Sequence, residues 1–491
     1  MNTTEISRMT IPAAPTDGYL VFVKRECPTC ALIEPLLREL ERDGVPMLVC
    51  SQDDAGFPAG MRQVVDDTPL EWSYRHAVEV VPTLIRMRDG SEAERTYGWD
   101  RAEWARITGR ADIGAQLPPL QPGCGSLSTG PGVSEALRAR YGDTGIRARR
   151  IDTGVWDDPE EVCYERGWTD GLPVIPPTDE RILRMLAGTR RDPAEVIGLM
   201  PPNLAPCSVE KVAINAVMAG CKPEYMPVLL TALEAALDPL FTLHGVTCST
   251  CFSGAIIVVN GPIARAIGMN WGMNVLGQGN RANSTIGRAL NLVVRNVGGA
   301  VPGGIDRATI GGPHKIGLCF AEDETDPDWE PLSVARGVPR GRSAVTLYQG
   351  DAVQGFVDQR SRTPEELARS LAMGLAAVAH PKLCEFTNAM LVLGPEHYRI
   401  FKSGGWDRAR LEAELRTALK RPGADLVYGA GGVGEGIPAS RADEMVDKFW
   451  PEGLLVVRGG GEAGFFSGIL PGWTGGRFRK ETQPVTKEIL R

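Results

Sequence analysis

The chain has 491 residues, of which 43% are hydrophobic and 23% are charged, and its formal net charge is -8. This is a globular composition, long enough for about two to four domains. An acidic chain without long blocks of lysine and arginine does not suit nucleic-acid phosphates, and no apolar run approaches the ~20 residues that cross a bilayer. We therefore expect no nucleic-acid partner and no membrane partner.

The N-terminal sequence and the cysteine count indicate a reducing compartment. The first 18 residues lack the basic and then apolar order of a signal peptide, so we expect a cytoplasmic protein. The 11 cysteines are odd in number, so a complete set of intramolecular disulfides is impossible. In a reducing cytosol we expect most of them to be thiols, and any disulfide to be catalytic rather than structural.

The most informative motif is Cys27-Pro28-Thr29-Cys30, which lies between an apolar run over 19–23 and a segment with helical apolar spacing over 31–40. A thiol at a helix N-terminus lies near the positive end of the helix dipole, which favours the thiolate. A second thiol two residues further on closes a disulfide with little chain movement. The pattern predicts a redox-active dithiol.

The surrounding sequence resembles the thioredoxin family over roughly residues 16–110. A second predicted strand over 46–50 follows the helix, and Val80-Val81-Pro82-Thr83 precedes a third. The resemblance implies a thioredoxin-like fold in which a cis-proline loop, here with Pro82, faces the cysteines. A zinc knuckle is the alternative that Cys-x-x-Cys leaves open.

The rest of the chain is expected to form a larger α/β domain. A Pro/Gly/Ser-rich stretch predicts a linker or arm over 113–149, between a domain at 1–112 and another at 150–491. Similar strand, Gly-Pro turn and helix patterns recur at 254–267 and 388–400, and a strand with a glycine turn recurs at 453–461. Short apolar runs alternating with helices favour strands buried on both faces.

A second Cys-x-x-Cys, Cys248 to Cys251, follows His244 and precedes a predicted strand. Its thiols suit an electron-accepting disulfide, a nucleophile with its resolving partner, or half of a metal site; two buried small residues are the structural alternative. Cys207 and Cys221 bracket one predicted helix, and with these residues they suit an N/S site for zinc, copper or iron.

Two further groups are candidate binding residues. Asn280 and Arg281 precede a helix predicted over 286–294, and Arg458 is followed by Gly459 and Gly460; both groups suit a carboxylate or phosphate. His314 is a candidate for proton transfer. Cys124, in the predicted linker, is either a thiol that reaches one of the dithiols or a plain exposed thiol.

The stretch from Trp168 to Asn296 is similar to uncharacterised bacterial proteins that carry two motifs. The motifs stand at 170–178 (DGLPVIPPT) and at 218–225 (MAGCKPEY). The similarity implies a domain family and no mechanism.

The leading hypothesis is an oxidoreductase in which Cys27 attacks, Cys30 resolves, and Cys248 with Cys251 receives the electrons. The partners that we expect are a small anionic substrate, an external thiol reductant and a second copy of the chain. We expect one pocket to hold the catalytic and the binding residues of the second domain: Cys221, Cys248, Cys251 and His244 with Asn280, Arg281 or the glycines at 459–461. Two alternatives stay open, namely a metal-dependent lyase or hydrolase and a disulfide-handling chaperone.

Overall fold

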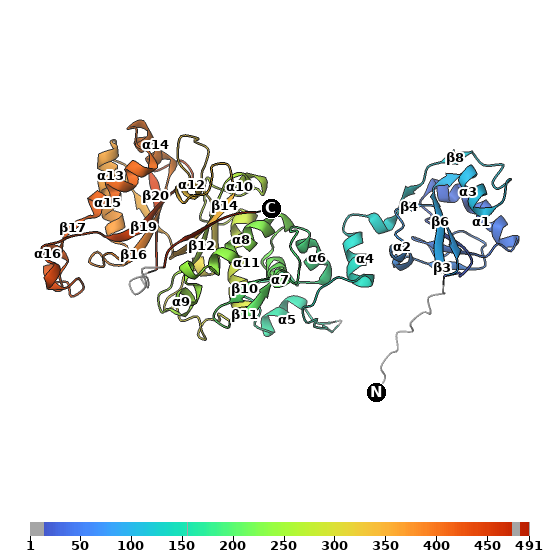
Figure 1. Cartoon of the computed structure of the whole chain (residues 1–491), viewed down its shortest axis with the longest axis horizontal. Coiled ribbons are helices and arrows are strands. Elements are labelled where there is room, and N and C mark those ends of the chain that lie inside the picture. Colours follow the sequence, from blue (N-terminus) through green and yellow to red (C-terminus); the bar gives the residue numbers. More distant parts are fainter. Residues whose placement is uncertain (1–13, 155, 474–481, 491) are drawn as a thin grey trace. The chain divides into compact units, whose positions relative to one another are not determined.

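The computed structural model describes residues 14–154, 156–473 and 482–490. The chain divides into two compact units, Met1–Gly145 and Ile146–Arg491 (Figure 1). Helices and strands are mixed in both units, so the protein belongs to the α/β class.

The first unit is built on one five-stranded sheet. The strands of the whole unit are β1 (Gly18–Val23), β2 (Met47–Ser51), β3 (Val64–Asp66), β4 (Val80–Val81), β5 (Thr83–Arg88), β6 (Ser91–Tyr97), β7 (Trp99–Asp100), β8 (Leu120–Gln121) and β9 (Cys124–Gly125). Its helices are α1 (Pro28–Arg42), α2 (Glu71–Arg75), α3 (Arg101–Thr108), the 3-10 turn η1 (Leu127–Thr129) and α4 (Val133–Tyr141). The sheet order is β3-β2-β1-β5-β6, with β1 parallel to β2 and antiparallel to β5.

Strand β1 and helix α1 form the centre of the first unit because of their apolar pattern. All six residues of β1 are buried. Helix α1 starts with Pro28, whose fixed φ suits a first turn, and it buries one stripe that includes Ile33, Leu37 and Leu40. The chain therefore passes from the centre of the sheet directly into a helix N-terminus at Cys27.

The Pro/Gly-rich segment is part of the first unit as far as Gly145. Strand β8 pairs with β7, and β9 pairs with β4 in the register Val81 to Cys124. The segment expected from the sequence to be a linker over 113–149 thus supplies two short strands and α4 to this unit.

The second unit contains two four-stranded sheets and a larger set of helices. Its strands are β10 (Val196–Met200), β11 (Ala205–Ser208), β12 (Gly254–Asn260), β13 (Leu318–Ala321), β14 (Ala344–Gly350), β15 (Gln354–Val357), β16 (Thr387–Leu393), β17 (Arg421–Pro422), β18 (Met445–Val446), β19 (Phe449–Arg458), β20 (Phe466–Pro471) and β21 (Val485–Glu488). Its α-helices are α5 (Pro159–Glu165), α6 (Asp179–Leu186), α7 (Val209–Ala219), α8 (Met226–Ala236), α9 (Leu243–Cys248), α10 (Pro262–Ala266), α11 (Arg281–Asn296), α12 (Leu332–Ala335), α13 (Pro364–Ala376), α14 (Pro395–Ser403), α15 (Arg408–Leu419) and α16 (Gly423–Leu426). The 3-10 turns are η2 (Pro223–Tyr225), η3 (Pro239–Phe241), η4 (Pro313–Lys315), η5 (Ala430–Gly432) and η6 (Ala439–Arg441). The sheet orders are β13-β12-β14-β21 and β15-β20-β16-β19.

The two sheets of the second unit pack against each other, and helices cover their outer faces (Figure 1). Alternate residues of a strand point to opposite faces, so Ile256 and Val258 of β12 meet Met390 and Val392 of β16 in the shared layer. The intervening residues of β12 pack with α7, α8 and α11, and those of β16 pack with α13 to α15. Burial on both faces explains why these strands read as continuous apolar runs.

The similar segments at 254–267 and 388–400 have the same local structure. One forms β12 and α10, and the other forms β16 and α14. Each strand contributes two residues at matching positions to the layer between the two sheets, Ile256 and Val258 from β12 and Met390 and Val392 from β16.

Within the described residues no single helix has the length and apolar character needed to cross a bilayer. One pair of neighbouring segments, Pro223–Ala236 and Pro239–Cys248, reaches that length and character only jointly, with a 70° bend between the two.

Candidate functional site

The first candidate site is the dithiol at the start of α1. Cys27 has extended backbone angles as the residue before the helix, and Cys30 lies in the first turn. Both residues are fully buried. The Sγ atom of Cys27 lies 3.4 Å from the carbonyl oxygen of Val81, and the peptide bond from Val81 to Pro82 is cis. The structure therefore places Cys27 and Cys30 close to the loop that carries Pro82.

The two thiols differ in their tendency to ionise. A hydrogen bond from the Cys30 thiol lowers the pKa of Cys27 to about 5, against the opposing effect of burial, and the Cys124 thiol and the amides of Thr29 and Cys30 add to the lowering. Burial raises the pKa of Cys30 far above its ordinary value. At neutral pH, Cys27 is therefore the thiolate and Cys30 is the protonated partner.

A third thiol, Cys124, completes this site. Its side chain is half-buried and lies within hydrogen-bonding reach of Cys27. The contact with Cys27 raises the pKa of Cys124, and burial acts in the same direction. Cys124 is therefore a thiol that contacts the first dithiol, rather than a plain exposed thiol.

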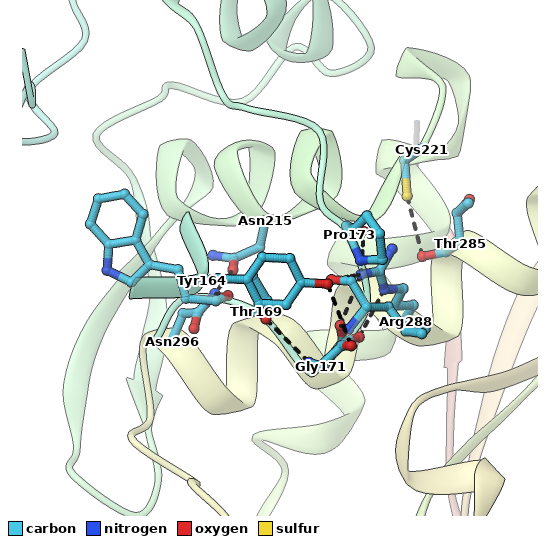
Figure 2. A network of polar contacts seen from close by, with 12 residues as sticks. Tyr164, Thr169, Gly171, Pro173, Asn215, Cys221, Thr285, Arg288 and Asn296 are labelled. Atoms are coloured by element: carbon cyan, nitrogen blue, oxygen red, sulfur yellow. Dashed lines mark hydrogen bonds and ion pairs between the residues drawn. The ribbon is translucent and has the colours of Figure 1, made fainter. Parts of the chain in front are cut away.

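In the second unit, the DGLPV motif is bound to helix α11 (Figure 2). Arg288 forms a two-pronged ion pair with Asp170 at 2.8 Å and also donates to the carbonyls of Leu172 and Pro173. Asn296 donates to the carbonyl of Trp168. Burial opposes ionisation of Asp170, but its bonds to Arg288 are stronger and its pKa is lowered. The motif is therefore an extended loop held by one helix face.

Cys221 lies near this network and is buried. Its thiol donates to the carbonyl of Thr285 at 3.4 Å, and burial raises its pKa to about 12. Burial likewise raises the pKa of Cys207 to about 11. A thiol with so high a pKa is a poor nucleophile at neutral pH.

A pocket of about 340 Å³ opens beside the DGLPV loop. Its polar lining residues are Asp170, Thr247, Ser253, Asn291, Arg295, Asp306 and Lys315. Lys315 pairs with Asp306 at 2.8 Å, and the buried Nδ2 of Asn291 and Nε of Arg295 have no hydrogen-bond partner among the described residues. The two cationic residues in the pocket wall, Arg295 and Lys315, suit a ligand with an anionic group.

A chain of polar groups leads from the second Cys-x-x-Cys to this pocket. The thiol of Cys251 lies 3.5 Å from the hydroxyl of Ser253, and that hydroxyl donates a short hydrogen bond to Asp351. Burial raises the pKa of Asp351, and His314 interacts electrostatically with the carboxylate. The arrangement joins a thiol, a hydroxyl, a carboxyl and an imidazole, which are the groups used in proton transfer.

His314 itself is buried and neutral. Its Nε2 lies 2.7 Å from the carbonyl oxygen of Phe252, so Nε2 carries the proton and Nδ1 is left as an acceptor without a partner among the described residues. Burial lowers its pKa, which keeps the ring neutral at physiological pH.

Cys248 ends α9, where it is half-buried, and burial together with Asp306 raises its pKa. His244 is exposed on the same helix. The residues Val246, Thr247 and Ser253 line the pocket, so the two cysteines flank its wall without lining it.

A second, more open pocket of about 600 Å³ lies at the carboxyl ends of β16 and β19. Arg458 and Gly460 line it. Arg458 is buried, pairs with Asp323 at 2.8 Å, and lies over the ring of Tyr398. The amide of Gly460 donates to the carbonyl of Trp271, and that of Gly459 to Leu393, so these two amides are already bonded.

Asn280 and Arg281 have structural contacts. Asn280 is the N-cap of α11, accepting from the amide of Asn283 and donating to the carbonyl of Gly268. Arg281 donates to the carbonyl of Gly220. The helix starts at Arg281 rather than at residue 286, because Asn280 supplies the cap.

The catalytic and binding residues that the sequence assigns to a single pocket are not brought together in either of the two pockets described above. Neither of the two pockets, both made of described residues, is lined by Cys221, Cys248, Cys251, His244, Asn280 or Arg281. Over the part of the chain that the structure describes, no group of three or more His, Cys, Asp or Glu side chains is arranged to hold a metal ion, the set of Cys207, Cys221, Cys248, Cys251 and His244 included.

Several site residues could not be chosen from the sequence. Asp351 is about 100 residues from Ser253 and reaches it because β14 pairs with β12 in the register Gly254 to Gly350. Asn291 and Arg295 read as ordinary polar positions of a helix. Asp170 did carry a signal, because it belongs to the DGLPVIPPT motif, and Ser253 follows the second Cys-x-x-Cys by two residues.

No protein-family model matches the chain, and no curated protein matches its sequence.

Proposed function

We propose that the first unit is a thiol–disulfide oxidoreductase related to the thioredoxin family, in which Cys27 attacks and Cys30 resolves. The lowered pKa of Cys27, about 5, at the start of α1 is the observation that carries this proposal. The passage from β1 through Cys27 into α1 and back to a parallel β2 supports the family relationship. A thiolate in contact with a protonated partner is equipped to open a substrate disulfide and then to be released.

In this proposal the second unit uses the electrons. The thiolate of Cys27 attacks a disulfide between Cys248 and Cys251, a mixed disulfide with Cys251 forms, and the Cys248 thiolate leaves. Cys30 then displaces Cys251, so two electrons pass to the second unit and an external thiol restores the first. Covalent linkage of donor and acceptor gives effective concentrations on the order of mM.

The substrate of the second unit is proposed to be a small molecule with a carboxylate or a similar anion. The pocket beside the DGLPV loop supports this class, since the cationic residues Arg295 and Lys315 both line its wall. The chain from Cys251 through Ser253 to Asp351 connects the electron-accepting thiol to the pocket. This assignment takes the place of Arg281, whose side chain is bonded within the fold.

Trapping of the mixed disulfide tests the transfer. The full chain is prepared as the double variant Cys30→Ser/Cys124→Ser, oxidised mildly with oxidised glutathione, blocked with an alkylating agent and mapped by mass spectrometry. The expected product links Cys27 to Cys251 or Cys248. The same variant with Cys27→Ser added is the control, and it should give no link to the second unit.

The transfer is excluded if Cys27 carries only glutathione in the double variant while Cys248 and Cys251 are alkylated. Oxidation of Cys248 and Cys251 to a disulfide that Cys27 never attacks would also exclude it. Either result would leave the first unit as an oxidoreductase that acts on other disulfides.

A further inference from the structure

The segment that carries Cys124 is bonded to both sides of the dithiol. Thr29 donates its hydroxyl to the carbonyl of Pro122 at 2.5 Å, and Lys24 donates to the carbonyl of Gly125 at 2.8 Å. Strand β9 pairs with β4, so Cys124 lies opposite Val81 in the ladder. The segment therefore covers the same edge of β4 that the Cys27 thiol contacts.

A buried hydrogen-bond network holds the residues that follow Cys124 in the chain, Ser126 to Ser128. Gln52 donates to the hydroxyl of Ser126 at 2.7 Å, and its side-chain oxygen accepts from the amide of Leu127 at 3.0 Å. Ser128 donates to the carbonyl of Val78 at 2.6 Å. Cys124 is thus held on both sides by bonds to the body of the unit, and its contact with Cys27 does not depend on a free loop.

The close approach of the Cys124 segment to strand β4 depends on Gly123. A Cβ atom at this position would lie 2.5 Å from Val80 and 2.7 Å from the carbonyl oxygen of Val81, distances that only glycine allows. A Cβ atom on Gly125, two residues further on, would meet nothing within 4 Å.

We propose that Cys124 is a third redox thiol, which competes with Cys30 for Cys27 and forms an alternative Cys27–Cys124 disulfide. The inference rests on the proposed oxidoreductase activity of the first unit and extends it. A Cys27–Cys124 bond would tie the 120–129 segment to the dithiol and block the site with a segment of the protein itself.

The chemistry balances with a small disulfide as the two-electron oxidant. The Cys27 thiolate attacks oxidised glutathione, so that a mixed disulfide forms and one glutathione thiolate leaves. The Cys124 thiolate then attacks Cys27, forming the intramolecular disulfide and releasing the second glutathione. In the absence of oxidant, Cys124 can also exchange with a Cys27–Cys30 disulfide, and the proton of Cys124 then passes to Cys30.

The environments of the two competing thiols favour Cys124 in the mixed disulfide. The pKa of Cys30 is raised mainly by burial, which persists after Cys27 has reacted. The pKa of Cys124 is raised mainly by its contact with Cys27, and this effect ends when Cys27 loses its negative charge in the mixed disulfide. Cys124 then ionises more readily than Cys30, and the thiolate is the attacking form.

Disulfide mapping of the full chain tests the inference. The variant Cys30→Ser is treated with oxidised glutathione, alkylated at low pH and digested. The expected main product is a peptide that links Cys27 to Cys124, with no glutathione on Cys27. The wild type should give both the Cys27–Cys124 and the Cys27–Cys30 peptides.

Two glycine variants form a matched pair. Gly123→Ala moves the segment away from Val81 and is expected to remove the Cys27–Cys124 peptide from oxidised protein while the Cys27–Cys30 peptide persists. Gly125→Ala has open space and should behave as the wild type.

Retention of glutathione on Cys27 in Cys30→Ser, with Cys124 fully alkylated, overturns the inference alone. A Cys27 thiol that ionises only near pH 9 and does not react with oxidised glutathione overturns the proposed function as well. The two failures are therefore distinguishable in the same set of samples.

Discussion

The Sγ atom of Cys27 lies 3.4 Å from the carbonyl oxygen of Val81. As a thiol, Cys27 donates a hydrogen bond to this carbonyl. As a thiolate it cannot donate, and the carbonyl dipole then opposes its charge. The low pKa of Cys27 therefore depends on the donors on its other sides, namely the thiols of Cys30 and Cys124 and the amides at the start of α1.

The first prediction is that Cys27 reacts as a thiolate over an unusually wide pH range. Its alkylation rate with iodoacetamide should rise with a midpoint near pH 5, where the pKa of the thiol is placed, and should be level from about pH 6.5 upward. Stopped-time alkylation with mass spectrometry of the Cys27 peptide measures the rate. The control is Cys50, whose pKa is raised by burial and whose peptide should be unmodified throughout.

The same ionisation contributes to stability in a defined direction. The folded-state pKa of Cys27 is lower than the ordinary value of 9.0, so the stabilisation is complete above pH 9 and is lost as the pH falls toward 5. The difference in free energy of unfolding between reduced wild type and Cys27→Ala should therefore decrease between pH 9 and pH 5. A difference that grows on acidification would contradict the low pKa.

The site of the first unit could largely be chosen from the sequence, because its elements follow one another locally. The apolar run of β1, the cysteines and the helical spacing of α1 lie within 25 consecutive residues. What the sequence did not fix is the place of Cys124. Its pairing with Val81 depends on bonds from Gln52, Lys24 and Thr29, which no periodicity of the segment reveals.

In the second unit the sequence predicted helices and strands better than it predicted which distant residues lie together. The apolar strands and the helix over 209–219, with its cap by Ser208, follow from local patterns. The grouping of Cys221 with Cys248, Cys251 and His244 did not follow, because the distances between them are set by sheet register and helix packing. Sequence reasoning also assigned Asn280 and Arg281 to a ligand, whereas the fold uses their polar groups to hold the start of α11.

The second prediction concerns the ion pair between Asp170 and Arg288. Asp170→Asn removes a charge from a largely buried pair and should lower the free energy of unfolding by about 2 to 3 kcal/mol at pH 7. Urea titration followed by circular dichroism measures the loss. The exposed pair of Arg150 and Asp179 is the control, and Arg150→Gln should cost less than about 1 kcal/mol.

The pH dependence of this pair has a known sign. The pKa of Asp170 is lowered in the fold, so its contribution is present above its ordinary value of 3.8 and is lost as the pH falls below that value. The gap in stability between wild type and Asp170→Asn should therefore narrow as the pH falls below 3.8. A gap that does not narrow on acidification would show that the amide disturbs packing rather than charge.

The third prediction tests the contact between α11 and β13. A Cβ atom on Gly287 would lie 2.8 Å from the amide nitrogen of Leu318, so Gly287→Ala should push the helix off the strand. The expected loss in free energy of unfolding is about 1 to 3 kcal/mol. Gly355→Ala is the matched control, because a Cβ atom there meets nothing within 4 Å.

The last prediction uses stability to identify a functional carboxyl. Burial raises the pKa of Asp351, so the fold disfavours the charged form of this carboxyl. Asp351→Asn keeps an acceptor for the Ser253 hydroxyl and removes the buried charge, and it should raise the free energy of unfolding at pH 7 by about 1 kcal/mol. The raised pKa means that protonated Asp351 is the form favoured in the fold, so this gain should shrink as the pH falls toward 3.8, the ordinary value of the carboxyl.

Asp358 is the matched control for Asp351, because its pKa is shifted in the opposite direction. Burial opposes its charge as well, but the amides of Arg360 and Ser361 and the Ser361 hydroxyl donate to its carboxylate, and the pKa is lowered. Asp358→Asn should therefore destabilise the protein at pH 7. Because unfavourable charge is retained where a reaction requires it, a stabilised Asp351→Asn that also loses turnover would mark Asp351 as part of the second unit's chemistry. A destabilised Asp351→Asn would instead assign this carboxyl to the support of the fold.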